Sequence, residues 1–113
     1  MLNRILLVGR LTRQPEAKAT SSGIPMVLFS LAVNRKIKEN EYVTFFDVVA
    51  FNAMWIYEHC DKGDLVYVEG EMRQYKDSKG RNRYNVIANR VVKLSSPRRQ
   101  ESELVSEDED VPF

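Results

Sequence analysis

The sequence is poor in the side chains from which many catalytic and metal sites are built. Of its 113 residues, one is cysteine and one is histidine. The single thiol, Cys60, excludes an internal disulfide and a thiolate zinc site. The lone His59 lacks the neighbouring spacings of metal-binding motifs, and no Gly-rich phosphate loop is present. We therefore predict no catalytic residue, no metal ligand and no cofactor.

Long apolar runs are also missing. The N-terminal run at residues 5–9 is closed by Arg10. Such a run is too short for a signal peptide or a membrane span. The length suits one domain with a modest core. We expect a reduced, cytoplasmic protein.

Positive charge is absent from the end of the chain. Residues 100–113 hold six Asp and Glu and no Lys or Arg, whereas residues 1–99 hold 17 Lys and Arg against 10 Asp and Glu. The body therefore carries +7 and the tail −6, within a net charge of +1. A basic body suggests a polyanionic partner, and the tail either shields that surface or contacts a basic partner of its own.

Hydrophobic periodicity favours strands over helices. Five β-rich runs cover residues 3–11, 23–35, 42–51, 65–73 and 83–94. Residues 52–63 instead place apolar side chains at helical spacing, with Asn52 as a plausible N-cap and Gly63 as the residue that ends the helix. The order predicts an all-β, five-stranded OB-fold barrel with one short helix between strands 3 and 4. A five-stranded meander with a packed helix is the alternative.

The domain organisation follows from where the periodicity stops. We expect the barrel domain at residues 1–94, a short flexible linker at residues 95–105 and an acidic tip at residues 106–113. The last two segments lack apolar periodicity, which predicts disorder.

The third strand carries aromatic residues on both faces. One face holds Val43, Phe45, Asp47, Val49 and Phe51. The other holds Tyr42, Thr44, Phe46, Val48 and Ala50. Because a small barrel has one interior, at least one set must reach solvent or a subunit partner, unless the sheet is buried on both sides. Exposed aromatics on a basic surface suit single-stranded nucleic acid, since each stacked base is worth roughly 1–3 kcal/mol whatever the sequence.

Basic residues gather next to that strand and in the last hairpin. The first group is Arg35, Lys36 and Lys38. The second group surrounds Tyr75 and consists of Arg73, Lys76, Lys79, Arg81 and Arg83. A solvated polar hairpin would explain these charges but not the tyrosine among them. A carboxylate metal site of a nuclease, built from Asp47, Glu69 and Glu71, is an alternative, although such pairs on strands are commonly solubilising charge.

With these residues in view, the chain resembles the bacterial single-stranded DNA-binding protein family. The resemblance rests on the segments NRILLVGRLTRQPE, FSLAVNR, FFDVVAF, KGDLVYVEGEMR, RNRYNVIANRV and DEDVPF. It implies an OB-fold that assembles as a homotetramer and wraps single-stranded DNA without sequence preference. It also implies a nucleoid-associated protein of replication, recombination and repair that has no enzymatic activity.

The resemblance also implies roles for individual residues. Base-stacking positions fall on Phe45, Phe51 and Tyr75, with a further family position at Ile37. Phosphate-binding positions fall on Arg4, Arg10, Arg35, Lys62, Arg73 and Lys76, to which the basic loop adds Lys36 and Lys38. None of the stacking positions is tryptophan, and Trp55 is expected to pack within the helix. Asp47 stands where the family can carry a basic residue, and its carboxylate would repel phosphate.

The acidic tip is the most specific element of the resemblance. It implies a docking peptide for partner proteins, formed by Asp108, Glu109, Asp110, Val111, Pro112 and Phe113. In this mode the terminal phenylalanine enters an apolar pocket of the partner and the acids meet basic residues around it. Two other interpretations remain open at this point. One is an RNA-binding OB-fold protein, and the other is a protein adaptor whose aromatics form only subunit contacts.

Overall fold

The structure is a computed structural model that describes residues 1–96. The acidic tip and all but the first two residues of the expected linker lie outside the described residues. Within residues 1–96, six strands and one short helix follow one another along the chain. They are β1 (Ile5–Leu11), β2 (Glu16–Ala19), β3 (Pro25–Ile37), β4 (Asn40–Phe51), α1 (Met54–His59), β5 (Leu65–Lys76) and β6 (Asn82–Ser95).

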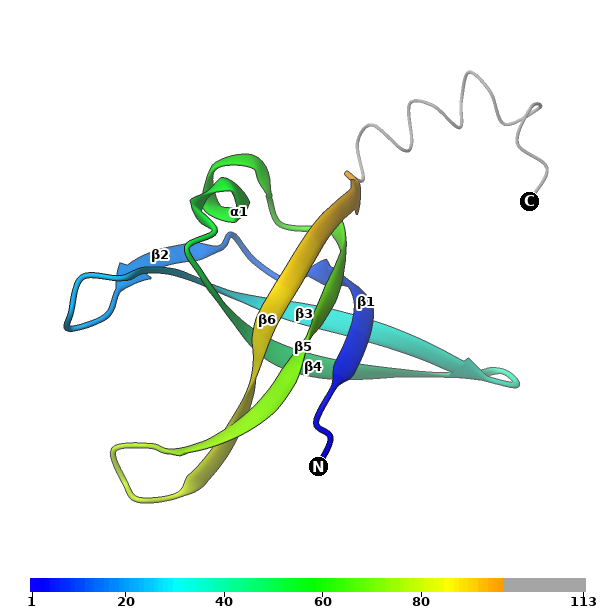
Figure 1. Ribbon diagram of the computed structural model, residues 1–113. Coiled ribbons are helices and arrows are strands. Elements are labelled where there is room, and N and C mark those ends of the chain that lie inside the picture. Colours follow the sequence, from blue (N-terminus) through cyan, green and yellow to red (C-terminus); the bar gives the residue numbers. More distant parts are fainter. Residues whose placement is uncertain (97–113) are drawn as a thin grey trace.

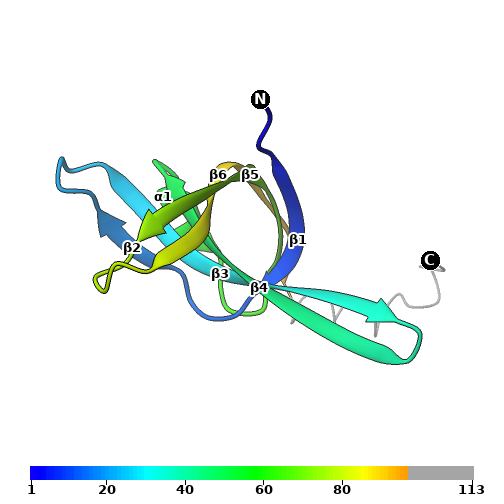
Figure 2. The same cartoon turned by 90° about the horizontal axis from the view of Figure 1, so that it is seen from below.

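Five of the strands close into the expected barrel. The sheet order is β1-β5-β6-β4-β3-β2, and an additional pairing of β1 with β3 closes the ring. Figure 2 looks into this ring from one end, with β1, β3, β4, β5 and β6 around it. The β4–β6 pairing is parallel and the other pairings are antiparallel. This is the OB-fold predicted from the order of strands and helix.

The core fills the inside of the barrel. Alternate positions on the strands turn inward, and they carry mainly branched aliphatic side chains, which pack well on a pleated surface. The buried set is Leu7, Leu11, Val27, Phe29, Leu31, Val48, Ala50, Ile56, Cys60, Val66, Val68 and Val86. Ile56 and Cys60 come from α1 and its C-terminal end, so the short helix closes one end of the barrel.

A glycine allows two strands to approach closely at a bend of the barrel. The register between β5 and β6 shifts between Glu69 and Gly70. A Cβ atom on Gly70 would overlap the backbone carbonyl of Ile87. Such an irregularity bends and twists a strand, which a small closed barrel requires.

Two features differ from the sequence prediction. Strand β2 was not predicted, because its four residues are all exposed and show no alternation; it is held by pairing with residues 25–28 of β3. The helix is shorter than residues 52–63. Asn52 has a φ of 54° and is not the N-cap, a place that Ala53 takes without a side-chain hydrogen bond. Gly63 lies in the turn before β5, where its N–H donates to the Leu11 carbonyl at 2.8 Å.

Two hairpins extend beyond the barrel in different directions (Figure 1). The β3–β4 pairing continues out to Ile37 and Asn40, and the β5–β6 pairing continues out to Lys76 and Asn82. These arms add surface without adding core. None of the helices within residues 1–96 has the length and apolar character needed to cross a membrane.

Candidate nucleic-acid interface

The outward face of β4 presents two phenylalanine rings. Val48 and Ala50 lie in the core, and Phe46 packs against it, so the even-numbered face of the strand is the interior. Phe45 is 66% exposed and Phe51 is 41% exposed on the opposite face. The interpretation with phenylalanines buried on both sides of a sheet is therefore wrong. The exposed set is the one that contains both expected stacking residues.

A cation lies on the same face as Phe45. Ala32 of β3 pairs with Phe45 on one side and with Arg10 of β1 on the other. Residues paired across neighbouring strands project from the same face of a sheet. The small Ala32 side chain thus separates the phenylalanine ring from the arginine. Arg10 also donates from Nη1 to the Gly63 carbonyl at 3.0 Å, which ties it to the turn before β5.

Lys62 belongs to that same turn. Its backbone N–H donates to the Gln14 side-chain oxygen at 2.8 Å, and the Gln14 amide donates to Asp61 at 3.1 Å. These two bonds hold the turn against the segment that follows β1. The structure therefore brings the predicted residues Arg10 and Lys62 together at one end of the barrel.

The outward face continues from β4 onto the second hairpin. Val49 of β4 pairs with Ile87 of β6, and Ile87 pairs with Glu71 of β5. Further along the hairpin, Tyr75 pairs with Arg83. Arg83 lies four residues before Ile87 on β6, so the two side chains project from the same face of the strand. The outward face defined by Phe45, Asp47, Phe51 and Tyr75 is therefore continuous across three strands. Arg73, also on this face, is paired with Glu71 at 2.6 Å.

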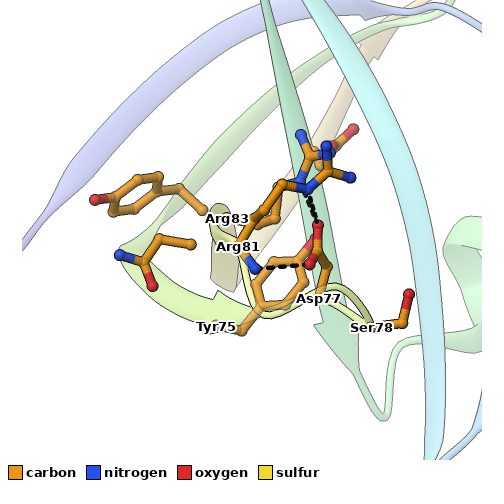
Figure 3. A pocket seen from close by; sticks show the side chains of 8 residues that line it. Tyr75, Asp77, Ser78, Arg81 and Arg83 are labelled. Atoms are coloured by element: carbon orange, nitrogen blue, oxygen red, sulfur yellow. Dashed lines mark hydrogen bonds and ion pairs between the residues drawn. The ribbon is translucent and has the colours of Figure 1, made fainter.

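A pocket of about 620 Å³ lies where this face meets the hairpin (Figure 3). Its lining consists of Asp47, Tyr75, Asp77, Ser78, Arg81, Asn82, Arg83 and Tyr84. Asp77 is its most connected residue and forms ion pairs with Arg81 at 3.0 Å and Arg83 at 3.1 Å. Lys76 lies at the start of the turn, and its Nζ donates to the Asn82 side chain at 3.0 Å.

Trp55 lines a second, smaller pocket beside α1. Trp55 was expected to pack within the helix, but it is 38% exposed. It lines a pocket of about 290 Å³ together with Phe51 and Arg90. The prediction failed because the helix is only six residues long, so its apolar spacing does not tell which side chains the barrel covers.

The first hairpin carries cations that have no partner within residues 1–96. Arg35, Lys36 and Lys38 are exposed, and Lys38 occupies the turn with a φ of 56°. In the strand register Lys36 lies opposite Glu41 of β4, and it shares the outward face with Phe45. Ile37 is 41% exposed at the tip.

Arg4, a predicted phosphate ligand, precedes β1 and lies close to Tyr67 of β5, whose hydroxyl donates to Glu69. That hydrogen bond raises the pKa of Tyr67, while the positive charges of Arg90 and Arg4 act in the opposite direction. Arg90 also lines the pocket that contains Phe51, and β1 neighbours both β3 and β5, so a phosphate contact by Arg4 stays a prediction.

The carboxylates considered for a nuclease site do not assemble. Glu71 pairs with Arg73, and Glu69 lies 4.0 Å from Arg90. Asp47 lines the hairpin pocket, to which neither glutamate contributes. Among residues 1–96, no three His, Cys, Asp or Glu side chains are grouped as a metal site.

The fold and this surface define a class of protein. An OB-fold barrel with outward aromatic rings and cations along one face has the architecture of a nucleic-acid-binding module. The model of the single-strand binding protein family matches residues 2–94, and the chain belongs to that family.

Several curated relatives support the assignment. The chain is 39% identical to a single-stranded DNA-binding protein of Thermotoga maritima, over 96% of this chain and 82% of that protein. It is 37% identical to one of Aquifex aeolicus, over 99% of this chain and 82% of that protein. A third, from Treponema pallidum, is 38% identical over 84% of this chain, and the match spans 59% of that protein.

Proposed function

We propose that this protein binds single-stranded DNA without sequence preference and protects it during replication, recombination and repair. The observation that carries the proposal is the pair of exposed rings, Phe45 and Phe51, on the outward face of β4. Single-stranded bases offer free π-faces to such rings, whereas the bases of a duplex are already stacked on one another. The cations on both hairpins supply the sequence-independent attraction to phosphate.

The proposed role is that of a binding protein and not of an enzyme. It would act in the cytoplasm on the nucleoid, and partner enzymes would be recruited through the C-terminal tip, whose residues 108–113 lie outside the described part of the chain. The charge distribution supports a separate role for the tip, because the acids of residues 100–113 cannot contribute to binding a polyanion.

We further propose a homotetramer. Within residues 1–96, β1 pairs with β3 only at Arg10 and Leu11, so residues 5–9 keep one open edge. Leu6 and Val8 are exposed on the outer face of this strand. An open edge with exposed apolar side chains favours pairing with another chain, and we propose that it pairs with the same strand of a second copy, which forms one of the interfaces of the tetramer.

The experiment that tests the function is fluorescence anisotropy with labelled oligo-dT, duplex DNA and oligo-U over a range of salt concentrations. The intact chain is compared with one that ends at Ser106. We expect tight, salt-dependent binding to oligo-dT, weak binding to duplex, and equal or tighter binding without the tip. Equal affinity for duplex, or a preference for oligo-U, would overturn the proposal. Sedimentation of the same samples reports the oligomeric state.

A further inference from the structure

The turn of the second hairpin is organised around one carboxylate. Asp77 Oδ1 accepts hydrogen bonds from the backbone N–H groups of Lys79 and Arg81, both at 2.9 Å. Asp77 Oδ2 accepts from Arg81 Nε at 3.0 Å and from Arg83 Nε at 3.1 Å. Figure 3 draws contacts to both oxygens of this carboxylate. One oxygen thus shapes the backbone of the turn and the other holds two guanidinium groups.

This arrangement leaves the arginines ready to bind a further anion. Each uses Nε for Asp77, and within residues 1–96 their Nη groups make no hydrogen bond. More than half of each arginine side chain is exposed, whereas the Asp77 side chain is only 18% exposed. Two guanidinium groups beside one carboxylate keep a net positive charge, and the free Nη atoms have the forked geometry that suits a phosphate.

A carboxylate from another strand also lines the pocket. Asp47 reaches it from β4, and within residues 1–96 its carboxylate has no hydrogen bond or ion pair. Tyr75 and Tyr84 also line the pocket, and Tyr75 shares the outward face with Arg83, whereas Tyr84 is paired with Gln74 on the opposite face. The pocket volume of about 620 Å³ falls in the range of small-ligand sites. A ligand that matches this lining has an anionic end, an aromatic body and a hydrogen-bond donor.

A nucleotide of single-stranded DNA has these three parts. Its phosphate suits the two arginines and its base suits the ring of Tyr75. A carboxylate accepts a hydrogen bond from the exocyclic amino group of cytosine. Thymine presents a carbonyl oxygen in the corresponding position, which a carboxylate repels.

We propose that this pocket binds one nucleotide of the strand. Arg81 and Arg83 bind the phosphate, Asp77 is a positioning residue that fixes both guanidinium groups, and Asp47 accepts a hydrogen bond from the base. The inference rests on the proposed single-stranded DNA binding. It adds two arginines and one nucleotide position that favours cytosine, while the rest of the surface binds without sequence preference.

The ionisation of Asp77 agrees with this role. The hydrogen bond from the Arg81 backbone, together with those from Arg83, Lys79 and the Arg81 side chain, lowers the pKa of Asp77 below its ordinary value of 3.8. Asp77 therefore stays charged and keeps both arginines in place throughout the neutral pH range.

The first test is Asp77→Asn, with Glu41→Gln as the matched control. Both changes remove one negative charge, and Glu41 lies on the outward face of β4 away from the pocket. If only net charge matters, both variants bind oligo-dT more tightly. The positioning role predicts the opposite sign for Asp77→Asn, because an amide keeps the Oδ1 contacts to the turn but cannot accept from the arginine Nε atoms.

We expect Asp77→Asn to bind oligo-dT about tenfold more weakly, which corresponds to the removal of roughly one charge-assisted hydrogen bond. The slope of log affinity against log salt should fall by about 0.7 for each phosphate that the variant no longer binds. Arg83→Lys keeps the charge but not the fork, and it should weaken binding in the same way. Thermal unfolding confirms that each variant is folded. If Asp77→Asn binds oligo-dT more tightly, by the same factor as Glu41→Gln, the inference is overturned. The proposed function is judged separately, by whether the unchanged chain binds oligo-dT.

The second test addresses the base. For the unchanged chain and for Asp47→Asn, the affinity for oligo-dC is divided by the affinity for oligo-dT. We expect this ratio to fall severalfold in Asp47→Asn and to stay constant in Glu41→Gln. An unchanged ratio in Asp47→Asn would overturn the role of Asp47 in reading the base.

Discussion

Replacing Phe45 with alanine separates binding from stability more cleanly than any other change on the outward face. The ring is 66% exposed, and it lies opposite the small Ala32 on β3. Complete burial of a phenylalanine side chain is worth about 1.5–3 kcal/mol. With one third of the residue covered, Phe45→Ala should lower the free energy of unfolding by only about 0.5–1 kcal/mol.

The expected loss in affinity is larger. If Phe45 stacks on a base, its removal costs about 1–3 kcal/mol of binding free energy, which is a factor of about 5 to 150 in affinity for oligo-dT. Anisotropy titration with oligo-dT measures this loss. Thermal unfolding measures the stability, and we expect the midpoint to fall by less than about 8 °C. Sedimentation shows whether the assembly is intact.

Val43→Ala is the matched control for this experiment. Val43 lies on the same face of β4 two residues earlier and is nearly half exposed, but it has no ring. Its replacement should change the affinity for oligo-dT less than about twofold, since it removes surface but no stacking. Our reasoning would be refuted if Phe45→Ala bound oligo-dT as tightly as the unchanged chain, or if Val43→Ala weakened binding as much as Phe45→Ala. The first result would favour the protein adaptor, in which the aromatics form only subunit contacts.

Three further predictions concern the helix end of the barrel. Trp55 is the only tryptophan of the chain and shares a pocket with Phe51, so oligo-dT should quench its fluorescence, and an unchanged signal at saturation would place the strand elsewhere. Lys93 forms an ion pair at 3.3 Å with the buried Asp64. Lys93→Met should lower the free energy of unfolding, measured in urea, by about 3 kcal/mol, which is the low end for a broken buried pair because Lys93 is partly exposed. Burial raises the pKa of the Cys60 thiol above its ordinary 9.0, so a thiol reagent at pH 8 should react only after denaturation, and rapid reaction of the folded protein would contradict this burial.

The barrel was predictable because its strands are long and alternate. In β5 the buried Val66, Val68 and Gly70 alternate with partly exposed neighbours. Strand β2 has no such signal, since all four of its residues are exposed and its pairing with β3 rests on backbone hydrogen bonds. Helix α1 was also too long in the prediction. Its actual start depends on the left-handed backbone of Asn52, which residue preferences alone do not specify.

The candidate site was predictable where it depends on strand parity. Phe45 and Phe51 follow from alternation along a single strand. The position of Arg4 beside Tyr67 could not be predicted in this way, because it depends on the pairing of β1 with β5 in the closed barrel. The hydrogen bonds of Asp77 were missed for a similar reason. They depend on the turn geometry that brings Arg81 and Arg83 to one carboxylate oxygen.

The two hairpins differ in how their cations are held, and this difference assigns them different parts in binding a strand. Arg81 and Arg83 are fixed by Asp77, so they lose little side-chain freedom when they bind a phosphate. Lys36 and Lys38 have no partner within residues 1–96, and each must lose about 0.5–1.5 kcal/mol of conformational freedom when it binds. The first hairpin also has the smaller net charge, since its three cations stand with Glu39 and Glu41 (+1), whereas the five cations of the second hairpin stand with Glu71 and Asp77 (+3). We therefore expect the second hairpin both to attract the strand and to fix its position, while the first hairpin adds weaker contacts.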